Sequence, residues 1–428
     1  MENTSLPVIR QRTHVHAGDA LAMSPPDTDR STPVRSLYIH VPFCFHKCHY
    51  CDFYSLVDTQ GRQESFTTRL ESEFAALSPL TQGVPLDTIF VGGGTPSLLE
   101  VPLWRRLLGR LRTLFDLSRM GEGDGEFTVE CNPETVTPEL METLAAGGVN
   151  RVSVGAQSFH QRHLKTLERW HEPANVVRAL SAATAAGIPR GSLDLIFAVP
   201  GQTLDDWLRD LDQAVAIGTD HISCYALTYE PRTALTARLA RGELTRADEE
   251  LEAEMFTLTV DRLRDAGLER YEVSNFARPG QECRHNLAYW RQAQWLAAGP
   301  SASAHVRGHR WKNIARLDDY LSSGTGFSPI VDHEPPDALR SLTECIMTGL
   351  RLREGVEIAG AVQGALPTGR TVLDRLGRLQ DRLVAAGLMN ANPDRWSLTD
   401  AGMLVADAVI VDVLLAIDGP GRPQRRAL

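Results

Sequence analysis

The 428-residue sequence lacks any long uninterrupted hydrophobic run. Its longest apolar stretch, ADAVIVDVLLAI near the C-terminus, carries Asp407 and Asp412, which suits a packed helix rather than a membrane span. The first 35 residues are rich in Pro, Ser, Thr and charged residues and contain no apolar stretch of signal-peptide length. We therefore expect a soluble, cytoplasmic protein.

Positive charge is also scarce. The chain has 44 Lys and Arg against 54 Asp and Glu, a formal net charge of −10. Nucleic-acid phosphates need a basic surface, and outside a short RPQRR stretch near the C-terminus the sequence offers none. We expect no nucleic-acid partner.

The sequence has no paired set of cysteines that would indicate a disulfide framework. It has seven cysteines, of which three are crowded into one loop. The other four are scattered, at Cys131, Cys224, Cys283 and Cys345. This pattern indicates a reducing compartment.

What the chain does have, from residue 36, is an alternation of short β-rich runs with longer helical patterns. Thr137 before Pro138 and Thr203 before a helical run predict helix starts, and a further helix is expected from Thr245 to Gly267. Repeated strand–helix units predict an α/β fold of parallel strands with right-handed crossovers, either open and doubly wound or curled into a barrel. The predicted strands are 36–43, 87–94, 125–133, 149–158, 191–201 and 221–228.

The unusual residues of this region fall where the predicted strands end. The three cysteines follow the first strand, GGGTPS the second, ECNPE the third and GAQS the fourth, while Asp194 and VPGQT belong to the fifth. The carboxyl ends of parallel strands share one edge of the sheet, so these residues predict one common pocket.

The chain divides into five segments by composition. Residues 1–35 and 418–428 are predicted flexible tails, 36–275 the strand–helix domain, 276–335 a structured connection rich in Gly, aromatic residues and His, and 336–417 a smaller domain. Helical patterns followed by a short strand-like run and another helix predict a small, winged-helix-like fold for the last of these.

Three thiols at Cys44, Cys48 and Cys51 have the spacing C-x3-C-x2-C. Thiolates are soft ligands that select zinc, copper or iron–sulfur clusters. A [4Fe–4S] cluster held by three thiolates leaves one iron open to a further ligand. The alternatives are a structural zinc with His46 or His49 as fourth ligand, and incidental or redox thiols.

The glycine run Gly92–Gly94 allows a ligand to approach the backbone closely, although a glycine run alone is equally typical of a tight turn. Together with the cysteine loop it resembles the radical S-adenosylmethionine (SAM) enzymes. Within them it is similar to the group that contains oxygen-independent coproporphyrinogen III oxidase and the heme chaperones of the HemW type. The resemblance runs from about Leu37 to Val411 and rests on YIHVPFCFHKCHYCDFYS, GGGTPS, ECNPE, RVSVGAQSF, DLIFAVPGQT, HNLAYW and LTDAGMLVAD.

The resemblance implies a partial (β/α)6 barrel and assigns roles by position in the motifs. The three cysteines would hold the [4Fe–4S] cluster, whose open iron binds the amino and carboxylate groups of SAM. The remaining SAM-binding or cluster-flanking residues would be Tyr38, Tyr50, Gly93, Gly94, Thr95, Glu130, Gln157, Arg169 and Asp194. Two departures are that Trp170 follows Arg169 where the family usually has a glycine-containing turn nearby, and that GPSASAH is poorer in glycine than the family form.

The loop stops at three cysteines, with Phe53 where the oxidase branch has a fourth. This pattern and HNLAYW resemble the HemW branch. A helical HNLAYW segment would put His285 and Tyr289 on one face. The residues implied to contact heme are His285, Asn286, Tyr289 and Trp290, against the alternative of a packed aromatic corner around a hydrogen-bonded histidine.

Three functions are therefore compared. The favoured one is a chaperone that binds heme, the cluster and SAM and hands heme to acceptor proteins, with an electron donor for the cluster as a further partner. The second is an oxidase that converts coproporphyrinogen III to protoporphyrinogen IX by radical SAM chemistry. The third is a zinc-stabilised α/β protein. Whether SAM is cleaved in the function is left open.

Overall fold

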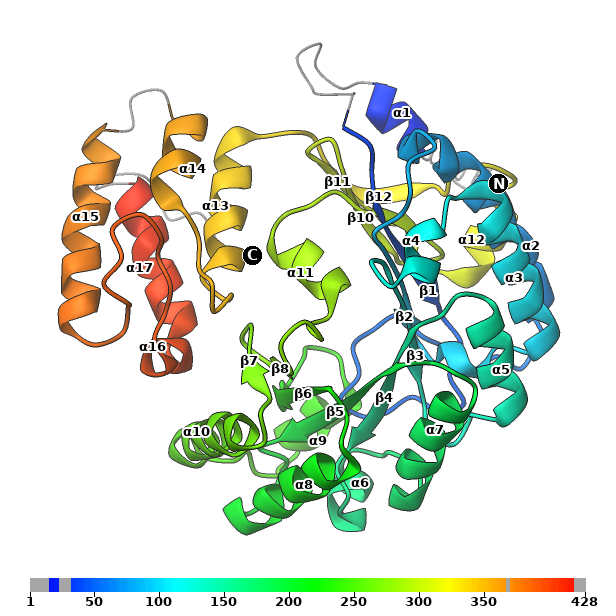
Figure 1. Cartoon of the computed structure of the whole chain (residues 1–428), viewed down its shortest axis with the longest axis horizontal. Helices are drawn as coiled ribbons and strands as arrows, with labels where there is room; N and C mark the ends of the chain where they lie inside the picture. The colour runs from blue at the N-terminus through cyan, green and yellow to red at the C-terminus, as the bar shows by residue number, and fades with distance from the viewer. Residues whose placement is uncertain (1–14, 23–31, 367–369, 419–428) are drawn as a thin grey trace, which may run out of the picture.

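The predicted strands form one curved parallel sheet in the computed structural model, which describes residues 15–22, 32–366 and 370–418 (Figure 1). Its order is β7-β8-β6-β5-β4-β3-β2-β1-β9, and β1 to β6 run parallel in sequence order. The strands are β1 (Ser36–Val41), β2 (Thr88–Gly93), β3 (Glu126–Cys131), β4 (Arg151–Gln157), β5 (Arg190–Phe197), β6 (His221–Ala226), β7 (Glu269–Arg270), β8 (Asn275–Ala277) and β9 (Leu296–Ala298).

Three edge strands were not predicted. β9 pairs parallel with β1, and β8 pairs antiparallel with β6 and β7. Each has two or three residues, too few to show the periodic pattern by which a strand is recognised in a sequence. The connecting segment holds a second, antiparallel sheet of β10 (Ser303–Val306), β11 (His309–Asn313) and β12 (Ile330–Glu334).

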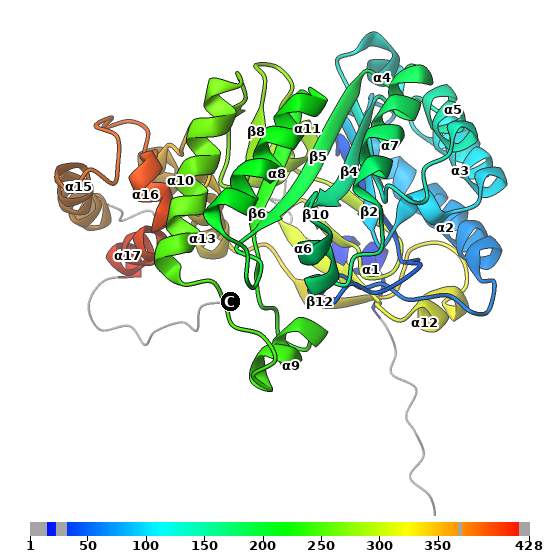
Figure 2. The same ribbon diagram turned by 90° about the horizontal axis from the view of Figure 1, so that it is seen from below.

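Helices cover the outer face of the main sheet, and α11 lies on its inner side (Figures 1 and 2). The central strands are buried on both faces, as expected for parallel strands covered by helices. The helices are α1 (Ala17–Ala22), α2 (Gln63–Leu77), α3 (Val101–Leu114), α4 (Ser118–Glu122), α5 (Pro138–Ala146), α6 (Gln161–Thr166), α7 (Pro173–Ala185), α8 (Leu204–Ile217), α9 (Ala234–Ala240), α10 (Glu249–Asp265), α11 (Arg284–Trp290), α12 (Leu317–Ser322), α13 (Ala338–Gly349), α14 (Ile358–Ala365), α15 (Arg370–Ala385), α16 (Asp400–Leu404) and α17 (Ala406–Asp418), with 3-10 turns η1 (Ser78–Thr81) and η2 (Pro96–Leu98).

Helix starts follow local capping chemistry. Thr137 caps α5, with Pro138 as its first residue, and Thr203 forms a capping box with Asp206 at α8, as predicted. The helix expected from Thr245 begins at Glu249 instead. Asp248 caps it by accepting a hydrogen bond from the amide of Leu251, so the carboxylate sets the start.

Part of the predicted N-terminal tail is ordered. Residues 17–22 form α1, whose Ala17, Ala20 and Leu21 are buried, and the amide of Ile330 donates to the carbonyl of Val15. Small side chains permit this close packing, which composition alone does not show. Residues 1–14, 23–31 and 419–428 lie outside the described residues, so the flexible-tail prediction is untested there.

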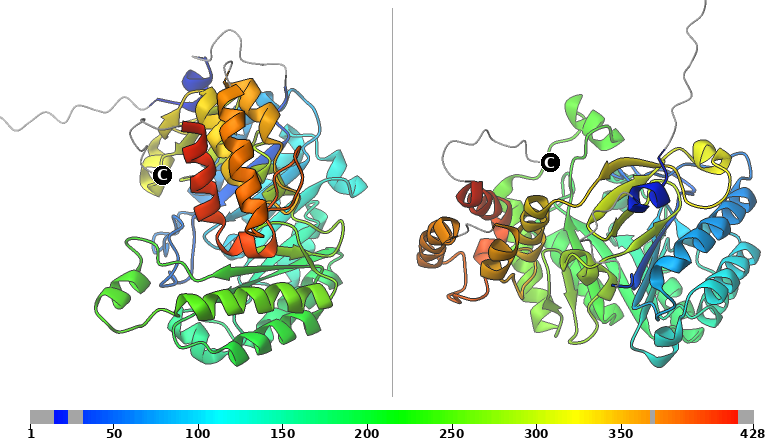
Figure 3. Two further views of the ribbon diagram at one scale, coloured as in Figure 1. Left: turned by 90° about the vertical axis from the view of Figure 1, so that its left-hand side faces the viewer. Right: turned by 90° about the horizontal axis from the view of Figure 1, so that it is seen from above.

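The C-terminal domain has its own hydrophobic core, built from α13 to α17 (Figure 3). After α15, an isolated bridge pairs Met389 with Leu398, and Trp396 pairs with Val356 from the segment between α13 and α14. The chain from α13 to α17 thus has helices, a short strand-like run and further helices. Within the described residues, no helix is both long and apolar enough to cross a membrane.

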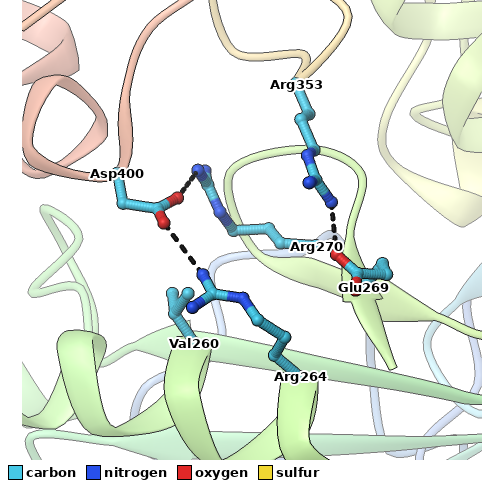
Figure 4. A pocket seen from close by; sticks show the side chains of 6 residues that line it. All are labelled: Val260, Arg264, Glu269, Arg270, Arg353 and Asp400. Carbon is cyan, nitrogen blue, oxygen red and sulfur yellow. Dashed lines mark hydrogen bonds and ion pairs between the residues drawn. The ribbon is translucent and has the colours of Figure 1, made fainter. Parts of the chain in front are cut away.

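Charged side chains join this domain to the main sheet (Figure 4). Asp400 accepts hydrogen bonds from Arg264 at 2.9 Å and Arg270 at 2.6 Å, and Arg353 pairs with Glu269. The Arg270 side chain is only 4% exposed, and its Nε and one terminal nitrogen have no hydrogen-bond partner among the described residues. The attachment therefore depends strongly on the carboxylate of Asp400.

Candidate cofactor site at the carboxyl ends of the strands

The cysteine loop leaves the carboxyl end of β1 and is tied at its base. The amide of Cys44 donates to the carbonyl of Leu56 at 2.9 Å, and the amide of Leu56 donates to the carbonyl of Pro42 at the same distance. Cys44, Cys48 and Cys51 are free thiols and partly exposed. Among the described residues, no three His, Cys, Asp or Glu side chains are arranged around a single metal ion.

Two polar side chains face the thiols. The Thr95 hydroxyl lies 3.5 Å from Sγ of Cys44, and one terminal nitrogen of Arg169 lies 3.7 Å from Sγ of Cys48. The other terminal nitrogen of Arg169 donates to the Gly155 carbonyl at 3.0 Å. Three soft donors beside a guanidinium suit a thiolate-ligated iron–sulfur cluster, because the cation stabilises the charged sulfurs. Tyr50 also lies beside Cys48. Burial, followed by the charge of the Cys48 thiolate, raises the pKa of Tyr50.

The glycine run ends β2 beneath the cysteine loop. A Cβ on Gly93 would lie 2.6 Å from the His40 imidazole, and one on Gly94 would lie 2.6 Å from the Phe43 carbonyl oxygen. Gly93 also has a φ of 105°, which favours glycine. Its amide donates to Oε2 of Glu130 at 3.2 Å. Close packing and backbone conformation therefore both require glycine here.

Two half-buried carboxylates, Glu130 on β3 and Asp194 on β5, interact with each other. Burial, followed by the charge of Asp194, raises the pKa of Glu130 to about 7. Burial also raises the pKa of Asp194, which accepts a hydrogen bond from the Ser153 hydroxyl at 3.0 Å. Such a pair favours a ligand that brings positive charge or hydrogen-bond donors.

Backbone strain collects at the same edge. Gln157 ends β4 with a φ of 62°, next to a register irregularity between Gly155 and Gln157. Ala198, directly after β5, has a φ of 58°. Positive φ at non-glycine residues costs free energy and is concentrated at binding sites. The predicted residues from β1 to β5 are thus brought to one edge of the sheet.

His40 was not singled out from the sequence. It lies two residues after Tyr38 on β1, and this two-residue spacing on a strand is the signal that both side chains share a face. Nε2 of His40 is 2.8 Å from the Tyr54 carbonyl oxygen and Nδ1 is 3.0 Å from the Tyr38 hydroxyl. Burial lowers the pKa of His40 to about 4.

The direction of these hydrogen bonds follows from the carbonyl, which can only accept. Nε2 of neutral His40 therefore carries the proton, and Nδ1 accepts from the Tyr38 hydroxyl. Because the hydroxyl hydrogen of Tyr38 is directed at Nδ1 of His40, the phenolic oxygen presents only acceptor capacity to a ligand. Tyr38 thus adds to the acceptor character set by Glu130 and Asp194.

The residues expected to contact heme are placed differently. α11 forms as predicted, its N-terminus held by Glu126, which accepts from the amides of Arg284 and His285. His285 is fully buried, with Nδ1 2.7 Å from the Thr88 hydroxyl and Nε2 2.8 Å from the Tyr289 hydroxyl.

His285 also stacks on Phe90, with ring centroids 5.3 Å apart. Each imidazole nitrogen of His285 thus has a hydrogen-bond partner in this structure. The surroundings resemble the packed aromatic corner given as the alternative, and heme contact by His285 stays a prediction. Asn286, Tyr289 and Trp290 are half-buried on the same helix.

Comparison with known proteins accounts for most of the chain. Residues 38–214 match the radical SAM superfamily and residues 338–405 the HemN C-terminal domain. The heme chaperone HemW of Mycobacterium tuberculosis is 38% identical over 382 residues, 88% of this chain and 94% of that protein. The chain belongs to the HemW family. HemW of Escherichia coli is 32% identical over 380 residues, 88% of this chain and 97% of that protein.

A solved structure extends the HemW comparison to the fold. Coproporphyrinogen III oxidase (HemN) of Escherichia coli superposes with a TM-score of 0.76 and 21% identity, covering 92% of this chain and 91% of that one. This likeness shows the fold, an α/β radical SAM domain with a helical C-terminal domain, as predicted. Membership of the superfamily implies a [4Fe–4S] cluster and SAM, and the HemW cysteine loop has a donor set that fits the cluster.

Proposed function

We propose that this chain is a heme chaperone that binds heme, a [4Fe–4S] cluster and SAM and transfers heme to acceptor proteins. The observation that carries the proposal is the 38% identity to a heme chaperone along 94% of that protein's length. The cysteine loop supports it, since Phe53 stands where the oxidase branch has a further cysteine.

In this proposal Cys44, Cys48 and Cys51 hold the cluster, which supplies an open iron and an electron when bound. Acceptor atoms of the protein would then bind the hydrogen-bond donors of SAM. Glu130 and the Tyr38 oxygen would accept from its ammonium and hydroxyl groups, since both have acceptor capacity in a half-buried site. The other proposed contacts are Tyr50, Gly93, Gly94, Thr95, Gln157, Arg169 and Asp194.

The second candidate is coproporphyrinogen III oxidase activity, which the fold likeness to HemN favours. Its substrate carries four carboxylates. The cysteine loop favours the chaperone over the oxidase, because Phe53 stands where the oxidase branch has a fourth cysteine.

The proposed partners are heme-accepting apo-proteins and an electron donor for the cluster. A direct experiment reconstitutes the protein anaerobically and titrates it with hemin, following the Soret absorbance. In parallel it is incubated with coproporphyrinogen III, SAM and a reductant, and the porphyrin products are separated. Saturable binding near one heme per chain, with transfer to apo-myoglobin and no protoporphyrinogen, is expected. Turnover without heme binding would instead establish the oxidase.

A further inference from the structure

Exposed aromatic side chains surround the cysteine loop. Phe45 is 73% exposed, Phe53 63% and Trp170 67%. They are linked through neighbouring residues: the His46 and Trp170 rings lie 5.7 Å apart, and Lys47 donates to the Phe53 carbonyl at 3.0 Å. We call Phe45, His46, Phe53 and Trp170 the cysteine-loop patch. Single exposed apolar residues are ordinary, whereas several on one loop and its neighbouring turn are typical of a binding surface.

His46 supplies the imidazole of this patch. Its side chain is 39% exposed, and its Nε2 is buried and has no hydrogen-bond partner among the described residues. At the other described histidines a ring nitrogen is hydrogen-bonded or the ring is buried, with the exception of His160. His160 packs instead against the buried His163, with ring centroids 5.6 Å apart.

One turn of backbone arranges the patch. After α6, the amide of Glu168 donates to Lys165 and the amide of Arg169 to Leu164, which is a Schellman motif. Glu168 occupies its left-handed position with a φ of 53°. The turn sends Arg169 inward to Cys48 and leaves Trp170 on the surface.

The Glu168 carboxylate connects the two rings of the patch. Its Oε2 accepts from the Trp170 indole at 3.2 Å and lies 3.8 Å from Nε2 of His46. A carboxylate beside a histidine orients the ring for metal binding. The exposed Trp170 can change rotamer at the cost of this hydrogen bond and of its packing against His46, and thereby admit a flat ligand.

We propose that the cysteine-loop patch is the heme-binding site, in which a ring nitrogen of His46 ligates the iron and the porphyrin plane packs against Trp170 and Phe45. This inference rests on the proposed heme-chaperone function. Aromatic faces suit a porphyrin, imidazole suits its iron, and the exposed Lys47 suits a propionate. Heme bound there is reached directly by an acceptor protein, without opening the core around His285.

The test compares hemin titrations of the full-length protein and its variants, read by Soret position and apparent Kd, with iron–sulfur content measured on each. His46→Ala is expected to bind heme roughly tenfold more weakly and to shift the Soret band. Trp170→Ala is expected to weaken binding severalfold. The matched control is His160→Ala, another half-buried histidine without a ring hydrogen bond, which should bind as the parent does.

The outcomes separate this inference from the proposed function. If the parent binds heme, and His46→Ala and Trp170→Ala bind it with the same Kd and Soret spectrum, the proposed heme site is wrong. The proposed chaperone function is then unaffected. No heme binding by the parent overturns the chaperone itself. If Trp170→Ala binds heme as the parent does but no longer transfers it to an acceptor protein, the cysteine-loop patch binds the acceptor. That result also contradicts the proposed heme site. If His46→Ala does not fold, Trp170→Ala and Phe45→Ser decide, because both side chains are exposed.

Discussion

Arg169 joins the cysteine loop to the end of β4, with one terminal nitrogen 3.7 Å from Sγ of Cys48 and the other 3.0 Å from the Gly155 carbonyl. Because the guanidinium is planar and forked, a single side chain holds both elements. The thiol and the strand end are thereby kept at a set separation.

Replacing Arg169 by Ala is expected to shorten the lifetime of the iron–sulfur cluster about tenfold, since a partly buried charge-assisted contact is removed. Arg169→Lys should give an intermediate lifetime, because an ammonium cannot serve both partners. The measurement is visible absorbance after anaerobic reconstitution, followed during chelator treatment. Arg162→Ala, at an exposed arginine of α6, is the control and should behave as the parent.

SAM binding is expected to strengthen as pH rises through about 7. The pKa of Glu130 is raised to about 7, so its carboxyl is mostly protonated at pH 6 and mostly ionised at pH 8. The ionised fraction differs by about tenfold between these values, and the affinity for the SAM cation should follow it. Calorimetric titration of cluster-loaded protein checks this. Glu130→Gln should bind weakly and equally at both pH values; a pH-independent parent would contradict the assignment.

His285 is expected to stabilise the fold without binding heme. His285→Ala removes a buried ring and leaves Thr88 and Tyr289 without their partner, at a cost of about 3 kcal/mol in the free energy of unfolding. Thr88→Val should cost about 1 kcal/mol. Urea unfolding measures both. A large change in the Soret band of soluble, folded His285→Ala would show instead that the histidine binds heme.

Glu73 links α2 to the segment around β9. It accepts hydrogen bonds from the Tyr320 hydroxyl at 2.6 Å and from the Gly299 amide and Asn313 side chain, both at 2.9 Å. Glu73→Ala should lower the free energy of unfolding by about 3 kcal/mol, because it leaves three buried donors unpaired. Tyr320→Phe should cost about 1 kcal/mol. Equal thermal melting of Glu73→Ala and parent would refute this.

Asp400 is expected to control the attachment of the C-terminal domain. Asp400→Ala leaves the buried guanidinium of Arg270 without its carboxylate, so the domain should separate more often and be cut faster by trypsin. Asp407→Ala, which breaks an exposed pair with Arg351 inside the domain, is the control. Equal cleavage rates in the two variants would show that the interface depends on its apolar contacts.

Much of this structure could be predicted from the sequence. The six strands, the caps Thr137 and Thr203 and the shared edge follow from local patterns, because side-chain period and capping chemistry are local properties. The position of His285 could not be predicted. Its two partners, Thr88 and Tyr289, come from β2 and α11, and only the folded chain shows that both nitrogens are used.

The pairing of β1 with β9 has a consequence for biosynthesis. Leu37 lies beside Leu296, so the strand that carries the cysteine loop waits for well over half of the chain to leave the ribosome before its second neighbour exists. The hydrogen bonds that Gly299 and Asn313 donate to Glu73, next to β9, form later still, because both residues follow β9 in the chain. We therefore expect a nascent chain to carry its three thiols on an unfinished sheet, and iron and sulfide to be delivered to the completed site after synthesis.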